Sequence, residues 1–150
     1  MAQTAALAKI LVAVDGSEAS VEALRWAREL AGPFNAQIEA VTCWEFPQLY
    51  DGYVTMRPDD FAESAAKVME GAVRRVFGPE TPRNLTTQVV QGNPKSTLTE
   101  LSKGKDMLMV GRRGRSVVAG QLFGSVSAFC AAHAQCPVLV VHAPKPGPQE

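Results

Sequence analysis

The sequence predicts an α/β protein in which a parallel β-sheet carries helices on both faces. Short apolar runs rich in β-branched residues alternate with longer segments of helical period, a pattern typical of successive βαβ units. The central runs are almost continuously apolar, as expected of strands covered on both faces. With 150 residues, of which 46% are hydrophobic, the chain can bury one core. We therefore expect one domain over residues 1–143 and a disordered, proline-rich tail over residues 144–150.

The N-terminal part begins with the apolar run Lys9–Val14, which predicts the first strand. Ser17 can cap a following helix, whose apolar residues recur at three- and four-residue spacing until Gly32-Pro33, where we expect it to stop. Gln37–Trp44 predicts the second strand. Phe46–Pro58 has neither period and contains glycine and prolines, so we expect a long connection.

The middle of the chain repeats the alternation. Asp59–Phe77 has helical period and ends before Gly78-Pro79, which predicts the longest helix. Leu85–Val90 predicts the third strand. A short helix should begin near Pro94, a residue suited to the first turn, and end before Gly104.

The C-terminal part supplies the last two strands, Asp106–Gly111 and Pro137–His142. Between them a helix should begin at Gly124-Ser125 and end before Cys136-Pro137. Its buried stripe is expected to include Val126, Phe129 and Cys130, with His133 on that stripe or beside it in a structural role. Trp26 and Trp44 are expected to serve packing, and the three cysteines to be buried apolar groups.

The amino-acid composition argues against several classes of function. Fifteen Lys and Arg residues balance fifteen Asp and Glu residues, which disfavours non-specific nucleic-acid binding. The longest apolar runs are far shorter than the ~20 residues of a membrane-spanning helix, so we expect no membrane span. Three cysteines without a CxxC pair, and two histidines, argue against a disulfide framework or a metal centre. A reducing, cytoplasmic location is the expectation.

Two segments lie where open parallel sheets bind ligands, beyond the carboxyl ends of their strands. One is Val14-Asp15-Gly16-Ser17, with an acidic residue at a strand tip. The other is the glycine-rich loop Gly111–Ser125, which opens a helix and resembles neither a Walker loop nor a Rossmann fingerprint. Its glycines, helix amides and charged or hydroxylated side chains suit a phosphate; those side chains are Arg112, Arg113, Arg115, Ser116, Ser125 and Ser127. The alternative is a flexible connection with solvated arginines.

The chain resembles the universal stress proteins of the nucleotide-binding type. Their motif is G-x2-G-x9-G-[ST], and Gly111, Gly114, Gly124 and Ser125 match it without a gap. The first strand with Asp15, the turn Gly92-Asn93-Pro94 and the last strand also look like the family's, so the resemblance covers nearly the whole chain. It implies a five-stranded sheet of order 3-2-1-4-5, the adenine-nucleotide alpha-hydrolase-like fold, over residues 1–143. It also implies a homodimer formed through the last strand.

The same resemblance implies a set of nucleotide contacts. Asp15, beside Gly16, would contact the nucleoside, although its alternative role is to support the helix cap. The backbone near Ala13 and Cys43 would contact the adenine, with Val41 as an alternative to Cys43. The ribose and phosphates would be contacted by Gly111, Arg112, Arg113, Gly114, Arg115, Ser116, Val117, Gly124, Ser125 and Val126.

We therefore expect a cytoplasmic, ATP-binding regulator of the stress response, with Mg²⁺ accompanying the nucleotide and a protein partner that the sequence does not identify. One alternative is a slow ATPase in which Asp15 holds Mg²⁺ and Arg113 stabilises phosphate charge. Another is a nucleotide-free interaction module. The sequence does not discriminate among ATP, AMP and cyclic AMP.

Overall fold

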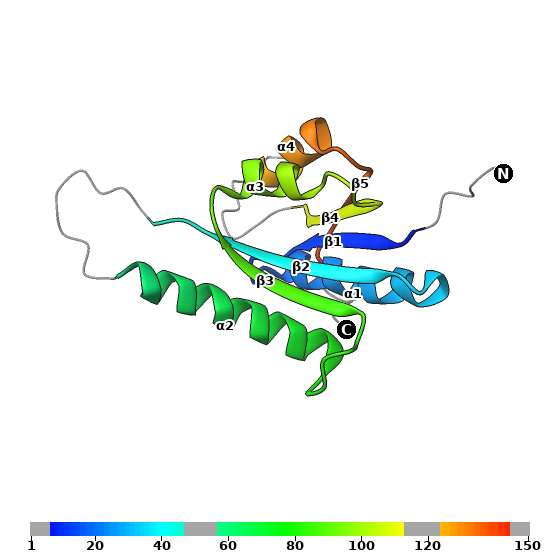
Figure 1. Ribbon diagram of the computed structural model, residues 1–150, viewed down its shortest axis with the longest axis horizontal. Helices are drawn as coiled ribbons and strands as arrows, with labels where there is room; N and C mark the ends of the chain where they lie inside the picture. Colours follow the sequence, from blue (N-terminus) through cyan, green and yellow to red (C-terminus); the bar gives the residue numbers. More distant parts are fainter. Residues whose placement is uncertain (1–6, 47–56, 113–123, 145–150) are drawn as a thin grey trace, which may run out of the picture.

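The computed structural model describes residues 7–46, 57–112 and 124–144 (Figure 1). The five strands form one parallel sheet in the order β3-β2-β1-β4-β5, which confirms the expected fold. The tail residues 145–150 and most of the expected connection before the second helix lie outside the described residues. In chain order the elements are β1 (Lys9–Ala13), α1 (Glu18–Phe34), β2 (Gln37–Trp44), α2 (Pro58–Phe77), β3 (Leu85–Gln91), α3 (Pro94–Leu101), β4 (Met107–Gly111), α4 (Ser125–His133) and β5 (Val138–Val141).

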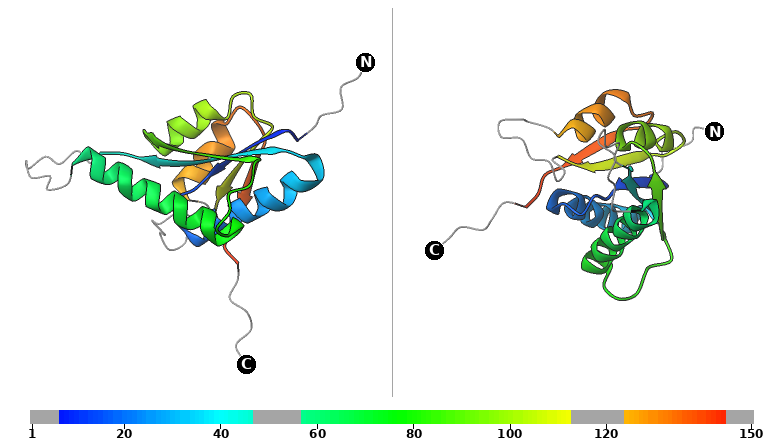
Figure 2. Two further views of the ribbon diagram at one scale, coloured as in Figure 1. Left: turned by 60° about the horizontal axis from the view of Figure 1, so that its bottom comes forward. Right: turned by 90° about the vertical axis from the view of Figure 1, so that its left-hand side faces the viewer.

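Helices α1 and α2 cover one face of the sheet, and α3 and α4 cover the other (Figure 2). The face covered by α1 and α2 holds the larger apolar cluster, which includes Ile10, Leu24 and Ile38. The face covered by α3 and α4 holds a smaller cluster built around Leu11, Leu98 and Leu108. Successive residues of β1 therefore alternate between the two clusters, as the period of a strand requires.

The C-terminus of α1 differs from the expectation. The helix continues through Gly32-Pro33 to Phe34 and ends at Asn35, which adopts a left-handed conformation with φ 53°. The amide of Asn35 donates to the carbonyl oxygen of Gly32 over 3.1 Å. A proline in the last turn removes one backbone hydrogen bond only, so it did not stop the helix.

The other helices begin and end close to the predicted residues. The Asp60 carboxylate accepts from the Arg57 amide over 2.9 Å at the start of α2, and Gly78 ends that helix with φ 80°. Asn93 Oδ1 accepts from the Lys95 amide over 2.9 Å at the start of α3. No described helix is long and apolar enough to cross a membrane.

Two side chains for which we expect structural or packing roles are exposed. His133 is exposed, and its ring lies against Phe129 with 4.4 Å between the ring centroids. The buried stripe of α4 includes Cys130, as expected, together with Ser127. Trp26 on α1 is also exposed, with 48% of its surface accessible.

Candidate functional site

A cavity of about 290 Å³ lies at the carboxyl ends of β1 and β4, where the strand order reverses direction. Apolar walls come from β1, β2 and α3, and polar groups come from the β1–α1 turn and the first turn of α4. The described residues that line it are Ala13, Val14, Asp15, Ser17, Ser20, Val41, Cys43, Pro94, Leu98, Val110, Gly111, Gly124, Ser125, Val126 and Ser127. The cavity is close to the lower end of the size range of small-molecule pockets.

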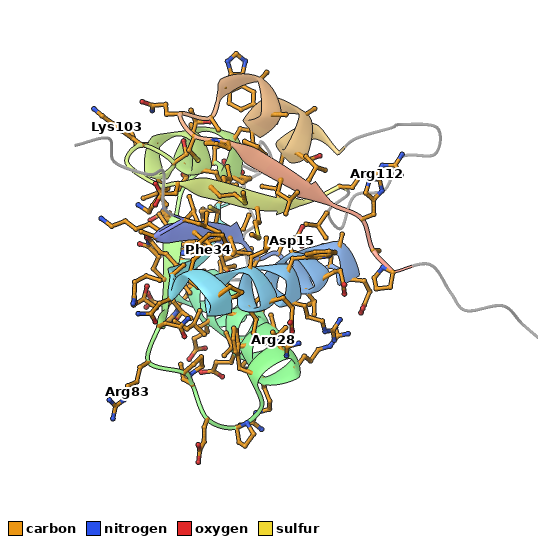
Figure 3. The ribbon with its side chains drawn as sticks, turned by 90° about the vertical axis from the view of Figure 1, so that its right-hand side faces the viewer. Asp15, Arg28, Phe34, Arg83, Lys103 and Arg112 are labelled. Atoms are coloured by element: carbon orange, nitrogen blue, oxygen red, sulfur yellow. The ribbon has the colours of Figure 1, made fainter. Side chains whose placement is uncertain are left out.

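Asp15 lies at the tip of β1, beside the N-terminus of α1 (Figure 3). Its Oδ1 atom accepts from the amide of Ser17 over 2.9 Å and from the hydroxyl of Ser17 over 2.5 Å. Ser17 in turn caps α1 by accepting from the Ser20 amide over 3.2 Å. Asp15 therefore supports the helix cap. Among the described residues no donor contacts its Oδ2 atom, so one carboxylate oxygen is left to a ligand.

Gly111, at the end of β4, packs against the first turn of α1. A Cβ atom there would lie 2.8 Å from the Cβ of Ala19 and 2.9 Å from the backbone nitrogen of Ser20. The missing side chain lets the end of β4 pack directly on the first turn of α1. Gly111 also lines the cavity, so this packing role is compatible with the expected approach of its backbone to a ligand. Gly16, with φ 85°, makes the turn before α1 and does not line the cavity.

Arg112 and Gly124 flank residues 113–123, which lie outside the described residues. The Gly124 amide donates to the Arg112 carbonyl oxygen over 2.5 Å. The Ser127 hydroxyl lies 2.8 Å from the same oxygen. The Arg112 amide donates to the Val141 carbonyl oxygen over 2.7 Å, which fixes this point to the end of β5. Arg112 is thus a backbone anchor, and its side chain lies 3.2 Å from His142 Nδ1 rather than in the cavity lining.

The N-terminus of α4 opens on the cavity without a side-chain cap. Gly124 occupies the capping position and offers no acceptor, whereas Ser17 and Asn93 cap α1 and α3 with their side chains. The first-turn amides of a helix carry partial positive charge and bind anions readily. Because Gly124, Ser125 and Val126 all line the cavity, this helix end is suited to a phosphate.

The cavity wall contains one cysteine from β2. Burial raises the pKa of the Cys43 thiol from its ordinary value of 9.0 to about 11, and the neighbouring Cys130 and Glu45 add to this shift. The thiol is therefore protonated at neutral pH and behaves as an apolar group. Burial is the largest cause of the raised pKa at all three cysteines, but only Cys130 is fully buried, and Cys43 and Cys136 are half-buried.

The structure brings half of the predicted contacts to the cavity. Ala13, Asp15, Cys43, Gly111, Gly124, Ser125 and Val126 line it, whereas Gly16 and Arg112 do not. Arg113, Gly114, Arg115, Ser116 and Val117 lie outside the described residues. Val41 and Cys43 both line the cavity, because they are two residues apart on the same face of β2.

Sequence reasoning missed the wall formed by Pro94 and Leu98 of α3. A signal was available: Leu98 is an apolar residue in the second turn of a helix that begins at the same edge of the sheet. The helical spacing alone indicates only that Leu98 faces the core. It is indeed 1% exposed, so it serves the apolar cluster and the cavity together.

The strand order and the cavity place the protein in the class of doubly wound α/β folds, whose ligands bind beyond the carboxyl ends of the strands. The model of the universal stress protein family matches residues 7–142, and the chain belongs to this family.

Individual proteins that resemble this chain are also universal stress proteins. Universal stress protein Rv3134c of Mycobacterium tuberculosis is 32% identical over 142 residues, which cover 94% of this chain and 50% of the relative. The chain thus spans about half the length of that protein. The solved structure of universal stress protein UspA from Lactobacillus plantarum superposes with a TM-score of 0.73 at 25% identity, covering 92% of this chain and 99% of the other. A universal stress protein solved in complex with cAMP gives a TM-score of 0.68 at 29% identity, covering 93% and 100%.

Proposed function

We propose that this protein binds ATP in the cavity and acts as a cytoplasmic, nucleotide-dependent regulator of a protein partner in the stress response. The observation that carries the proposal is the uncapped N-terminus of α4, which faces the cavity opposite the apolar walls of β2 and α3. A nucleotide needs both environments, because its base is flat and largely apolar at its faces while its phosphates are anionic.

The nucleoside would occupy the apolar part of the cavity. Ala13, Val41, Cys43 and Leu98 offer a dry surface for the adenine ring, and the protonated Cys43 thiol adds no charge. The free Oδ2 atom of Asp15 can accept from the ribose hydroxyls. A charge-assisted hydrogen bond of this kind contributes about 1.5–3 kcal/mol.

The phosphates would lie at the first turn of α4. Ser125 is exposed there and can donate its hydroxyl as well as its amide. The predicted loop residues Arg113, Gly114, Arg115, Ser116 and Val117 follow Arg112, whose backbone is fixed beside Gly124. We propose that they complete the phosphate site.

The residues of the cavity would hold Mg²⁺ only together with the phosphates of a bound nucleotide. No group of three or more Asp, Glu, His or Cys residues is positioned to hold a metal within the described part of the chain. Among the described residues that line the cavity, Asp15 supplies the single carboxylate. Magnesium sites in nucleotide-binding proteins typically use one or two carboxylates together with substrate phosphates, which fits Asp15. The ion would neutralise phosphate charge.

The choice of nucleotide needs a direct measurement. A relative of 29% identity was solved with cAMP, which supports an adenine nucleotide as the class of ligand. Protein purified without added nucleotide should release ATP when it is heat-denatured and the supernatant is chromatographed. Titration calorimetry with ATP, AMP and cyclic AMP should then give the tightest binding for ATP. Absence of binding to all three would overturn the proposal.

A matched pair of variants tests the phosphate site. Ser125→Asp adds a negative charge at the first position of α4, where acidic residues stabilise a helix but repel phosphate. Ser125→Asn keeps the size of that side chain without the charge. We expect Ser125→Asp to fold normally and lose ATP binding, and Ser125→Asn to retain most of it. Equal affinities for the two variants would contradict binding at this helix end.

We also propose a homodimer formed through β5, which is an edge of the sheet. The carbonyl oxygens of Pro137 and Val141 accept from β4, so the alternating residues Val138 and Val140 direct their backbone N–H and C=O groups outward. An apolar edge with unpaired groups promotes association. Antiparallel pairing with a second copy, with Val138 opposite Val140 in both directions, would satisfy all four groups symmetrically.

A further inference from the structure

Trp26 is one of two large apolar side chains that are exposed among the described residues, and the proposed nucleotide site uses neither. Ala19 and Ala23 precede it on the same flank of α1 and are buried, yet Trp26 is 48% exposed. Isolated apolar residues on a surface are common and need no explanation. The position of Trp26 relative to the free edge of the sheet makes this one different.

The orientation of Trp26 follows from its neighbours on α1. Arg28 marks the flank that faces α2, because its Nη1 atom donates to the Val76 carbonyl oxygen over 2.5 Å. Residues two positions apart in a helix, such as Trp26 and Arg28, are separated by about 200° around the helix axis. Trp26 therefore points away from α2. Since α1 packs against both α2 and β5, the opposite flank lies on the side of β5 (Figure 3).

The contact of Gly111 with α1 shows which part of β5 lies beside Trp26. Gly111 packs on Ala19 and is paired in register with Val141. From Ala19 to Trp26 the helix rises about 10 Å, and from Val141 back to Val138 the strand spans about 10 Å. Trp26 therefore lies level with β5. Phe34, the second exposed aromatic of α1 at 55%, is about 22 Å from Ala19 and lies past the start of the strand.

We propose that Trp26 fills the groove between two α1 helices when β5 pairs with β5 of a second copy. The inference rests on the dimer of the proposed function. Strands pair about 4.8 Å apart, and α1 packs more on β4 than on any other strand, so β4 and its symmetry mate would place the two α1 helices at least about 14 Å apart. Directly packed helices are 8–10 Å apart. The indoles of the two copies would fill the remaining space between the two α1 helices. Leu139, which faces the α1 side of the sheet, would lie beneath them.

The occupant is therefore a second copy of this chain. The free backbone groups of Val138 and Val140 require a strand partner, and the same edge on another copy supplies one in matching register. An unrelated strand could satisfy these groups, but only a second copy also places an α1 helix at the distance that Trp26 spans.

Sedimentation equilibrium of three proteins tests this inference. We expect the wild-type protein to dimerise, Trp26→Ala to raise the dimer dissociation constant about tenfold or more, and Phe34→Ala to change it less than about threefold. A monomeric wild-type protein at tens of micromolar would overturn the dimer and the role of Trp26 together. A dimer that Trp26→Ala and Phe34→Ala weaken equally would overturn the role of Trp26 alone.

Fluorescence provides a readout that keeps the residue in place. The sequence contains two tryptophans, so Trp44→Phe leaves Trp26 as the only one. Diluting this variant through its dissociation constant should shift the Trp26 emission to longer wavelength, because the indole becomes exposed to water. The shift should follow the sedimentation curve. Emission that stays constant while the dimer dissociates would contradict the proposal.

Discussion

The Arg112 carbonyl oxygen accepts the Gly124 amide at 2.5 Å and joins two residues that are twelve positions apart. The hydroxyl of Ser127 lies within hydrogen-bond distance of the same oxygen, and Ser127 is 1% exposed. The two positions that flank residues 113–123 are therefore fixed by backbone groups and one buried hydroxyl. Ser125, two residues earlier, is exposed at the cavity.

Replacing these two serines by alanine should affect different properties, stability for Ser127 and ATP binding for Ser125. Ser127→Ala leaves a backbone carbonyl with one donor fewer and should lower the free energy of unfolding by about 1–2 kcal/mol. Ser125→Ala should leave stability almost unchanged and weaken ATP binding, because we propose that its exposed hydroxyl contacts the ligand. Chemical denaturation and titration calorimetry of both variants measure the two effects. A loss of stability in Ser125→Ala comparable with that of Ser127→Ala would contradict this division.

Gly111→Ala should destabilise the fold. The new Cβ would meet Ala19 and the Ser20 nitrogen at 2.8–2.9 Å, and backbone atoms of a helix cannot move aside cheaply. We expect a loss of about 1–3 kcal/mol, as for other overpacked sites.

Gly71→Ala is the matched control, because nothing lies within 4 Å of its added Cβ in the interior of α2. Alanine should stabilise that helix by about 0.5–1 kcal/mol. Thermal unfolding should therefore move in opposite directions for the two variants. Equal midpoints would show that β4 does not depend on close contact with α1.

Much of this architecture was predictable from the sequence, because strand and helix periods are local. The sequence offered the two roles of Asp15 only as alternatives, because the contact that uses one carboxylate oxygen on Ser17 depends on the φ of 85° at Gly16. The packing role of Gly111 could not be inferred either, because Ala19 is distant in the sequence and a motif glycine suggests a ligand first. Trp26 was assigned to packing from residue type alone; its exposure depends on β5 being the edge of the sheet.

Asp15→Ala should weaken ATP binding and lower stability together. Loss of the charge-assisted bond to the nucleoside should cost about 1.5–3 kcal/mol of binding free energy. Ser17→Ala removes the helix cap while leaving the carboxylate, so it should lower stability by about 1 kcal/mol with a smaller effect on binding. If Asp15→Ala binds ATP as tightly as Ser17→Ala does, the residue serves the cap alone.

The buried thiols predict how stability depends on pH. Burial raises the pKa of Cys43 and of Cys130 to about 11, whereas in the unfolded chain each thiol titrates near its ordinary value of 9.0. Above that value the unfolded chain loses these protons while the folded chain keeps them. The stabilisation is therefore complete below pH 9.0 and is lost as the pH rises through about 11.

Denaturant unfolding at several pH values tests this linkage. The wild-type protein should lose more stability over that interval than the double variant Cys43→Ala, Cys130→Ala. Both proteins share their lysines and tyrosines, so the difference between their slopes isolates the thiols. Parallel pH profiles would mean that these thiols ionise freely in the folded protein.

Two proline substitutions on neighbouring residues of β5 test the proposed dimer. The amide of Val140 points to the free edge, so Val140→Pro removes an outward donor and leaves the ladder with β4 intact. The amide of Leu139 points to β4, so Leu139→Pro breaks the sheet itself and should cost about 3 kcal/mol of stability. We expect Val140→Pro to give a folded monomer that still binds ATP, because the cavity lies at the carboxyl ends of β1 and β4. Light scattering and circular dichroism distinguish the two variants. A folded Val140→Pro protein that remains dimeric would show that the copies associate through another surface.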